Sequence, residues 1–304
     1  MLGLVSLSLA VGLRSNSSSD PAHEVSISDP SYDESRAHLF YTLAGAAYCQ
    51  NASIGSWSCI PCARSNQSVV SNKIFYDKLT GARGFAGAFA DASGTTMIVF
   101  SFRGSEGLNN WIMNLNFAKT DHNMSCAGCK VHSGFYDCWR AMKDHGIVVE
   151  LRRLIATYPS AKVYTTGHSL GAAIAMLASY ELQYELKIPV DGVYTFGQPR
   201  VGNEAFHDFY NDNSPRVTWR LTHWRDPVPH LPLESMGFSH IGNEVWYNEK
   251  FTVGKVCDGS GEDPNCSDSL DFDTSVNDHL NYFEETIGEN GCGDAVEVVV
   301  EEEA

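Results

Sequence analysis

The chain has 304 residues, of which 43% are hydrophobic, and its formal net charge is −16. This length suits one large α/β domain or two small ones, and the hydrophobic fraction is enough to form a buried core. The acidity argues against nucleic acid as a partner, because few cations are left to neutralise phosphates, and against electrostatic docking on an anionic membrane. Solubility is its simplest interpretation.

We interpret residues 1–30 as a secretory signal peptide and flexible leader. Residues 2–13 form an apolar run that is too short to span a bilayer but suits a signal-peptide core. Arg14 follows this run and no basic residue precedes it, which is unusual for a signal peptide. The serine-rich stretch after it is typical of a flexible segment. We expect the folded domain at residues 31–293 and an acidic tail at residues 294–304.

The chain contains nine cysteines, so at least one of them lies outside any internal disulfide. Two close pairs have the C-x-x-C spacing that also occurs in zinc sites. No coherent set of four ligands accompanies them, even with His132 near the second pair, so we predict disulfides formed in an oxidising compartment and no metal site. Five Asn-x-Ser/Thr sequons also favour secretion: Asn16, Asn51, Asn66, Asn123 and Asn265.

Two elements are predicted before the centre of the chain. Residues 95–102 are rich in β-branched and aromatic side chains, which predicts a buried strand that carries the next loop to the carboxyl edge of a sheet. Residues 106–117 have apolar side chains close to helical spacing. On pattern alone they predict an ordinary surface helix; the alternative is a mobile lid hinged at Gly107. The apolar positions are Leu108, Trp111, Ile112 and Leu115.

The sequence Gly167-His168-Ser169-Leu170-Gly171 has the form G-x-S-x-G, the nucleophile elbow of serine hydrolases. Its two glycines allow a tight strand-to-helix turn that pushes the serine hydroxyl out of the sheet. The motif alone is weak. However, residues 161–166 before it predict a short strand, and residues 172–185 after it predict a helix rich in Ala and Leu. In that context Ser169 is the candidate nucleophile.

A serine nucleophile needs a histidine that takes its proton and an acid that orients the histidine. In the hydrolase-fold order both follow the serine. Residues 216–222 predict a strand, and Asp226 in the loop after it is the candidate acid, although Asp before proline is also a common turn residue. The later histidines are His230, His240 and His279. His230 is awkwardly close to Asp226 in sequence, so we favour His279, near the end of the domain.

The negatively charged intermediate of acyl transfer needs hydrogen-bond donors for its oxygen. The loop after the strand at residues 95–102 is Arg103-Gly104-Ser105. We assign one donor to the N–H of Ser105, whose hydroxyl adds a second bond. The other donor is the N–H of Leu170, the residue after the nucleophile.

With these motifs the chain resembles the secreted lipases of filamentous fungi, the class 3 lipase family, over about residues 32 to 292. The resemblance implies an α/β-hydrolase fold, with a central, mainly parallel sheet flanked by helices and a short helical lid that contains Trp111. It implies Ser169 as the nucleophile, Asp226 as the acid, His279 as the base and Ser105 at the oxyanion position. The matching segments are residues 102–105 with 110–112, then 131–135, 166–171, 195–203, 225–232 and 278–283.

The resemblance also implies a pairing of the cysteines. Cys138 is then left over, as a small buried residue on a helix that begins near Ser133. The implied pairs are Cys49 with Cys292, Cys59 with Cys62, Cys126 with Cys129, and Cys257 with Cys266.

By resemblance, the activity is hydrolysis of acylglycerol esters at a lipid–water interface, without a cofactor. We expect a secreted, extracellular monomer with no nucleic-acid partner and no stable membrane insertion. The alternatives on this fold are a feruloyl esterase or a phospholipase A1-type esterase. Ala172-Ala173 replaces the Gly-Ala of many family lipases and is shared with feruloyl esterases and some partial-glyceride lipases, whereas Trp111 favours a lipid substrate. A catalytically inactive binding module is opposed by the complete set of Ser169, Asp226 and His279.

Overall fold

The computed structural model describes residues 32–107, 116–122, 126–213, 215, 217–270 and 275–293. The expected leader, lid and acidic tail lie outside these residues, apart from the ends of the lid segment. Eight strands form a central sheet in the order β1-β2-β3-β6-β7-β8-β9-β10. They are β1 (Ser68–Tyr76), β2 (Arg83–Ala90), β3 (Thr96–Phe102), β6 (Lys162–His168), β7 (Gly192–Phe196), β8 (Val217–His223), β9 (Glu244–Tyr247) and β10 (Val253–Val256).

The central part of this sheet is parallel. β3, β6, β7, β8 and β9 pair in parallel, whereas β1–β2, β2–β3 and β9–β10 pair antiparallel. Two short antiparallel pairs lie outside it: β4 (Lys119–Asp121) with β5 (Lys130–His132), and β11 (Asn281–Tyr282) with β12 (Glu285–Thr286). Since the carboxyl ends of parallel strands meet at one edge, the loops after β3, β6, β7 and β8 lie close together there.

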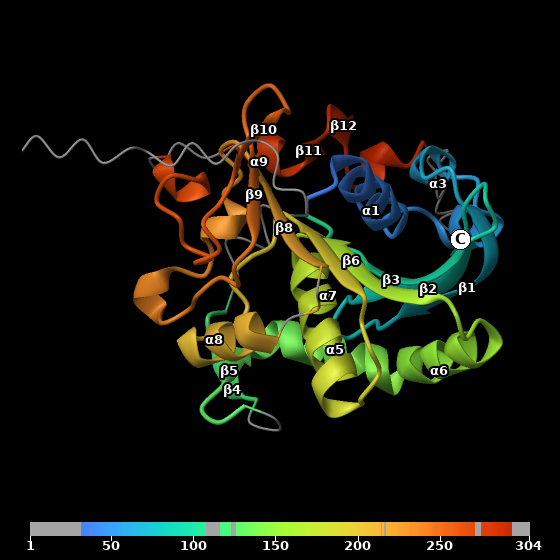
Figure 1. Cartoon of the computed structure of the whole chain (residues 1–304), viewed down its shortest axis with the longest axis horizontal. Helices are drawn as coiled ribbons and strands as arrows, with labels where there is room; N and C mark the ends of the chain where they lie inside the picture. Colours follow the sequence, from blue (N-terminus) through green and yellow to red (C-terminus); the bar gives the residue numbers. More distant parts are fainter. Residues whose placement is uncertain are drawn as a thin grey trace, which may run out of the picture.

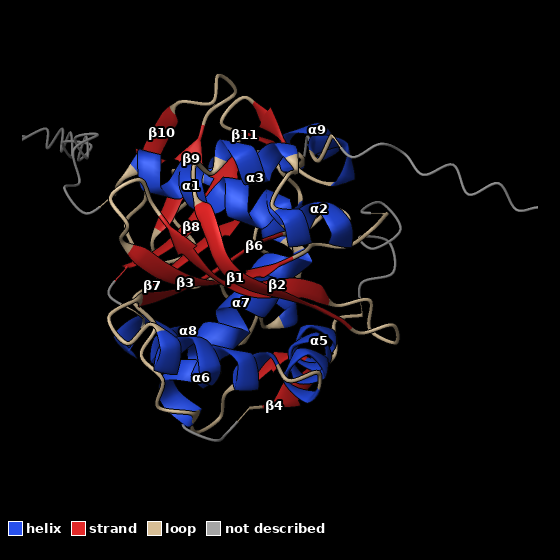
Figure 2. Cartoon of the chain, turned by 90° about the vertical axis from the view of Figure 1, so that its right-hand side faces the viewer, coloured by secondary structure: helices blue, strands red, loops and turns tan. Residues whose placement is uncertain are grey.

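Helices cover both faces of the sheet (Figures 1 and 2). One face carries α1 (Glu34–Ala46), α2 (Asn51–Ser56), α3 (Ile60–Arg64) and α9 (Val276–His279). The other carries α5 (Ser133–Asp144), α6 (Ile147–Thr157), α7 (Leu170–Tyr180) and α8 (Glu204–Asn213). The predicted helix at residues 172–185 is therefore α7, which begins earlier and ends in a π-helical turn at Glu181–Glu185.

The central strands are apolar because both of their faces are buried. On β3, Ile98, Phe100 and Phe102 belong to the core under α5, α6 and α7, whereas Val99 belongs to the core under α1. Side chains alternate between the faces of a strand, so a continuous apolar run serves two cores. None of the helices in the described part of the chain is long and apolar enough to cross a membrane.

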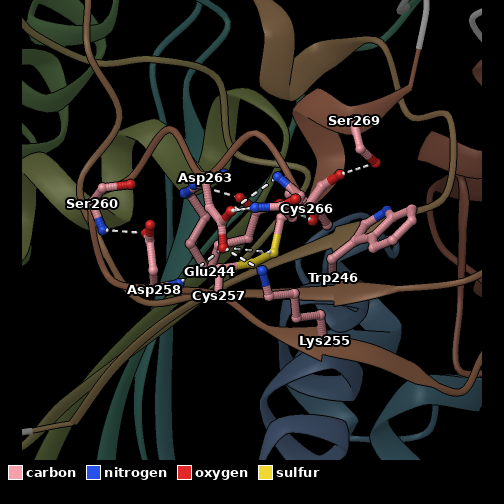
Figure 3. Close-up of a disulfide and its surroundings, with 12 residues drawn as sticks. Glu244, Trp246, Lys255, Cys257, Asp258, Ser260, Asp263, Cys266 and Ser269 are labelled. Atoms are coloured by element: carbon pink, nitrogen blue, oxygen red, sulfur yellow. Dashed lines mark hydrogen bonds and ion pairs between the residues drawn. A yellow bond between two sulfur atoms is a disulfide. The ribbon is translucent and has the colours of Figure 1, made fainter. Parts of the chain in front are cut away.

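Four disulfides are present, in the pairs that the family resemblance implies: Cys49–Cys292, Cys59–Cys62, Cys126–Cys129 and Cys257–Cys266. Cys138 is a buried free thiol on α5. Around Cys257–Cys266, Lys255 pairs with Asp263 at 2.8 Å, so the disulfide and an ion pair hold the same loop against β10 (Figure 3). Both C-x-x-C pairs are therefore disulfides here.

Candidate active site

Ser169 lies in a strained turn between β6 and α7. Its φ is 59° and its ψ is −127°, a backbone conformation that L-residues rarely adopt. A Cβ on Gly167 would lie 2.3 Å from the carbonyl oxygen of Gly171, and a Cβ on Gly171 would lie 2.1 Å from that of Phe102. Only glycine fits at both positions, which is the physical reason for the G-x-S-x-G pattern.

Asp226 and His279 form a buried pair. The His279 Nδ1 atom lies 2.8 Å from each carboxylate oxygen of Asp226. Asp226 follows β8, and His279 ends α9, whose first turn is capped by the Ser275 side chain. The loop after β8 and the short helix α9 thus bring together two residues that are 53 positions apart.

Asp226 is held as a carboxylate. Its Oδ1 accepts the Val228 N–H at 2.9 Å, and its Oδ2 accepts the Tyr282 hydroxyl at 2.8 Å. Burial by itself would raise the pKa of Asp226, but the adjacent His279 and these hydrogen bonds outweigh it and hold the pKa below its ordinary value. Burial, together with the Asp226 charge, raises the pKa of Tyr282 well above its ordinary value, so Tyr282 stays a hydrogen-bond donor.

Ser169 and His279 line one cavity of about 190 Å³. Because Nδ1 of His279 donates to Asp226, its Nε2 is the nitrogen that can accept a proton. Within the described residues, neither Ser169 Oγ nor His279 Nε2 has a hydrogen-bond partner, although both atoms are buried. A nucleophile–base hydrogen bond is often loose without a substrate, so this arrangement suits proton transfer from Ser169 to His279.

A second buried network lies behind His279. His168 Nε2 is 2.8 Å from the backbone oxygen of His279, and His168 Nδ1 is 2.8 Å from the Tyr48 hydroxyl. Burial, with a contribution from His279, lowers the pKa of His168 to about 3. The neutral ring therefore donates from Nε2 to His279 and accepts at Nδ1 from Tyr48, which anchors the backbone of His279.

The loop after β3 reaches the same cavity. Ser105 lines it beside Ser169, and a Cβ on Gly104 would lie 3.0 Å from the Ser169 Cβ. Arg103 is buried, pairs with Glu106 and donates to the Gly81 carbonyl at 3.1 Å, which holds the loop in place. The Leu170 N–H is at the first position of α7, where no helical carbonyl accepts it.

The lid residues that the sequence singled out, Leu108, Trp111, Ile112 and Leu115, lie outside the described residues. Three site residues were not assigned roles from the sequence. Tyr282 lies in the matching segment that contains His279. Gly197, where a Cβ would come 2.8 Å from His279 Nδ1, lies in the matching segment at residues 195–203. For both, the available sequence signal was their place in a family motif. Tyr48 had no sequence signal, because its partner His168 is 120 residues away.

The lipase (class 3) family model matches residues 99–236. The chain is 38% identical to a lipase from Rhizomucor miehei over 255 residues, which cover 80% of this chain and 67% of that protein. It is 34% identical to a secreted mono- and diacylglycerol lipase A from Penicillium cyclopium, over 68% of this chain and 69% of that protein. The chain belongs to the class 3 lipase family.

The fold of this class 3 lipase is also that of solved fungal lipases. A triacylglycerol lipase whose catalytic centre is formed by a serine protease triad superposes with a TM-score of 0.72 at 33% identity, covering 84% of this chain and 96% of that one. The predicted α/β-hydrolase fold is thereby confirmed. The class 3 lipase is a carboxylic ester hydrolase, as lipases are.

Proposed function

We propose that this class 3 lipase is a secreted enzyme that hydrolyses acylglycerol esters through Ser169, His279 and Asp226. The observation that carries the proposal is the buried His279–Asp226 pair, which shares a cavity with a serine in a strained strand-to-helix turn. Its relatives are described as lipases and as secreted mono- and diacylglycerol lipases. The four disulfides agree with an oxidising, extracellular compartment.

In the first half of the reaction, Ser169 Oγ attacks the ester carbonyl carbon while His279 Nε2 takes the hydroxyl proton. The carbonyl oxygen becomes an oxyanion that accepts hydrogen bonds from the N–H groups of Leu170 and Ser105. His279 then gives the proton to the leaving alkoxide oxygen, which departs as the alcohol of a glyceride. The acyl group remains on Ser169.

In the second half, His279 takes a proton from a water molecule, whose oxygen attacks the acyl carbon. Collapse of this intermediate returns the proton to Ser169 Oγ and releases the carboxylic acid. Asp226 keeps the imidazole in the Nδ1–H form and stabilises the imidazolium that forms in each half. No other reactant is consumed.

The cavity favours an ester with an apolar chain over a charged substrate. Leu280 and Ile287 line it together with the catalytic residues, and the acidic residues Glu106 and Glu289 line it as well. An acyl chain gains about 0.8 kcal/mol per buried CH₂ in such surroundings. We therefore rank glyceride esters above the feruloyl and phospholipid esters that the same fold accommodates.

Two measurements test this proposal. A fluorophosphonate should label Ser169, and Ser169→Ala should lose ester hydrolysis by several orders of magnitude without losing the fold. Rates on mono-, di- and triolein, phosphatidylcholine and methyl ferulate then rank the substrate classes. Activity retained in Ser169→Ala would refute the mechanism, and a preference for ferulate or phospholipid would refute the substrate assignment.

A further inference from the structure

A second cavity, of about 250 Å³, lies at the opposite end of the sheet from Ser169. Lys162 begins β6 and lines this cavity, whereas Ser169 follows the last residue of β6. At ~3.3 Å per residue, the two cavities are roughly 20 Å apart. We propose that the second cavity binds an amphiphilic anion with an unbranched alkyl chain, namely a fatty carboxylate. Its relevance rests on the proposed function, because a fatty carboxylate is the product of that reaction.

Two cations meet at this cavity. Lys162 and Tyr164 are two positions apart on β6, so their side chains project to the same face of the sheet. The Arg36 guanidinium of α1 lies 6.0 Å from the centroid of the Tyr164 ring. Among the described residues, neither Arg36 nor Lys162 forms a direct ion pair with a carboxylate, although Asp33 interacts electrostatically with Arg36. Because neither cation is neutralised by a direct ion pair, both can contact an anionic group that enters the cavity.

Asp91 also lines the cavity, but its carboxylate is engaged in its own turn. Its Oδ1 accepts the Ser93 N–H at 2.8 Å, the Ser93 hydroxyl at 2.6 Å and the Thr95 N–H at 3.0 Å. These bonds hold Asp91 Oδ1 in the turn between β2 and β3. They also lower the pKa of Asp91, so its carboxylate stays charged, and two cations face one anion among the residues that line the cavity.

The wall next to the cations is apolar. Phe40 of α1 packs on Tyr164 with ring centroids 4.9 Å apart. Leu39 and Met97 are partly buried against the same core and line the cavity. Met97 is the parallel-strand partner of Lys162, so an apolar side chain lies directly beside a charged one. This arrangement matches a ligand with one carboxylate and one alkyl chain, because the carboxylate can contact the cations while the alkyl chain contacts the apolar wall.

The chain-length dependence of binding follows from this wall. Each added methylene that the wall covers should tighten binding about fourfold, the equivalent of ~0.8 kcal/mol per buried CH₂. Binding by the two cations alone would be equally weak for acetate and decanoate. Alkyl length thus distinguishes a built amphiphile site from simple ion attraction.

The experiment uses the full chain with Ser169→Ala, which prevents turnover of any ester while binding is measured. A dodecanoate that carries a photoreactive diazirine is added below its micellar concentration and irradiated, and the labelled peptides are identified. We expect label on peptides from α1 and from the starts of β3 and β6, in addition to peptides that line the catalytic cavity. Excess dodecanoate should suppress the label at the second cavity most strongly, dodecanol should suppress it less, and dodecyltrimethylammonium should suppress it least.

Charge reversal provides the matched comparison. Arg36→Glu/Lys162→Glu should reduce label at the second cavity at least tenfold and leave label at the catalytic cavity unchanged. Arg152→Glu/Lys250→Glu makes the same change in net charge at exposed positions elsewhere and should leave both labels unchanged. Because Arg36 also hydrogen-bonds Tyr194, Lys162→Glu alone, which spares that bond, is measured in parallel and should lower the label in the same direction.

Three outcomes would overturn the inference: no label on the α1 and β6 peptides, equal label in the two double variants, or equal competition by the cationic amphiphile. Hydrolysis by the wild-type chain is assayed separately. If the Ser169→Ala chain carries no label at the second cavity while the wild type hydrolyses esters, only the second site is rejected. If the wild type does not hydrolyse esters, the proposed function is rejected and the binding result still stands.

Discussion

Gly197 lies directly against the ring of His279: a Cβ at position 197 would come 2.8 Å from the imidazole Nδ1 and 2.7 Å from Asp226 Oδ2. Gly197 follows β7 and has a φ of 55°. The close approach of the acid and the base therefore depends on a residue without a side chain in the neighbouring loop.

Gly197→Ala is expected to push the His279–Asp226 pair apart. A displacement of about 1 Å in a catalytic group lowers kcat on the order of 100-fold. Gly94→Ala is the matched control, because Gly94 has a φ of 81° but open space around its Cβ position. Both variants should lose stability through backbone strain. Only Gly197→Ala should lose kcat on a soluble ester; equal kcat in the two variants would contradict this relationship.

Tyr48→Phe tests the network behind His279. The change leaves His168 Nδ1 buried without a donor, which costs about 1–3 kcal/mol of stability. Because the same ring anchors the backbone oxygen of His279, kcat should fall while KM changes little. Tyr210→Phe removes a comparable buried hydroxyl contact, to Ser179, and should reduce stability without affecting kcat. The anchoring role fails if both variants keep the wild-type kcat.

Acid lability is expected from His132. Burial lowers the pKa of His132 to about 4, whereas the unfolded residue titrates near 6.5. Between these values the unfolded state binds more protons, so the free energy of unfolding falls as the pH falls. His132→Asn removes this titration and keeps a side-chain acceptor for the Phe135 N–H. Urea unfolding at a series of pH values from 4 to 8 gives the free energy of unfolding at each pH. Below pH 6.5, this free energy should depend less steeply on pH in the variant than in the wild type, by about 1.4 kcal/mol per pH unit. An equal pH dependence in the variant and the wild type would show that His132 does not cause the acid lability.

The Cys49–Cys292 disulfide should dominate the stabilisation by cross-links. It joins residues 243 positions apart, whereas Cys59–Cys62 joins residues only three apart. In the loop-entropy model, removing the first as a double serine variant costs about 5 kcal/mol and removing the second about 2 kcal/mol. Chemical denaturation of both variants measures the difference. Equal losses would show that strain or residual unfolded-state structure, and not loop entropy, sets the stabilisation.

The local elements of this protein were determined by the sequence itself. The apolar run at residues 95–102 becomes β3 (Thr96–Phe102), and the elbow glycines lie where a Cβ has no room. Such features depend on neighbours within a few positions, so composition and spacing are enough to predict them. The expected order of serine, acid and histidine came instead from the chain order of the hydrolase fold.

The sequence and the family resemblance favoured His279 among the three later histidines, but only the tertiary structure shows which partner each of them has. His230 pairs with Asp268 at 3.0 Å, and His240 Nε2 hydrogen-bonds the Pro229 carbonyl at 2.6 Å. His279 alone of the three contacts Asp226. That contact spans 53 positions and depends on the register of β8 in the sheet and on the docking of α9, which no local pattern of residues encodes.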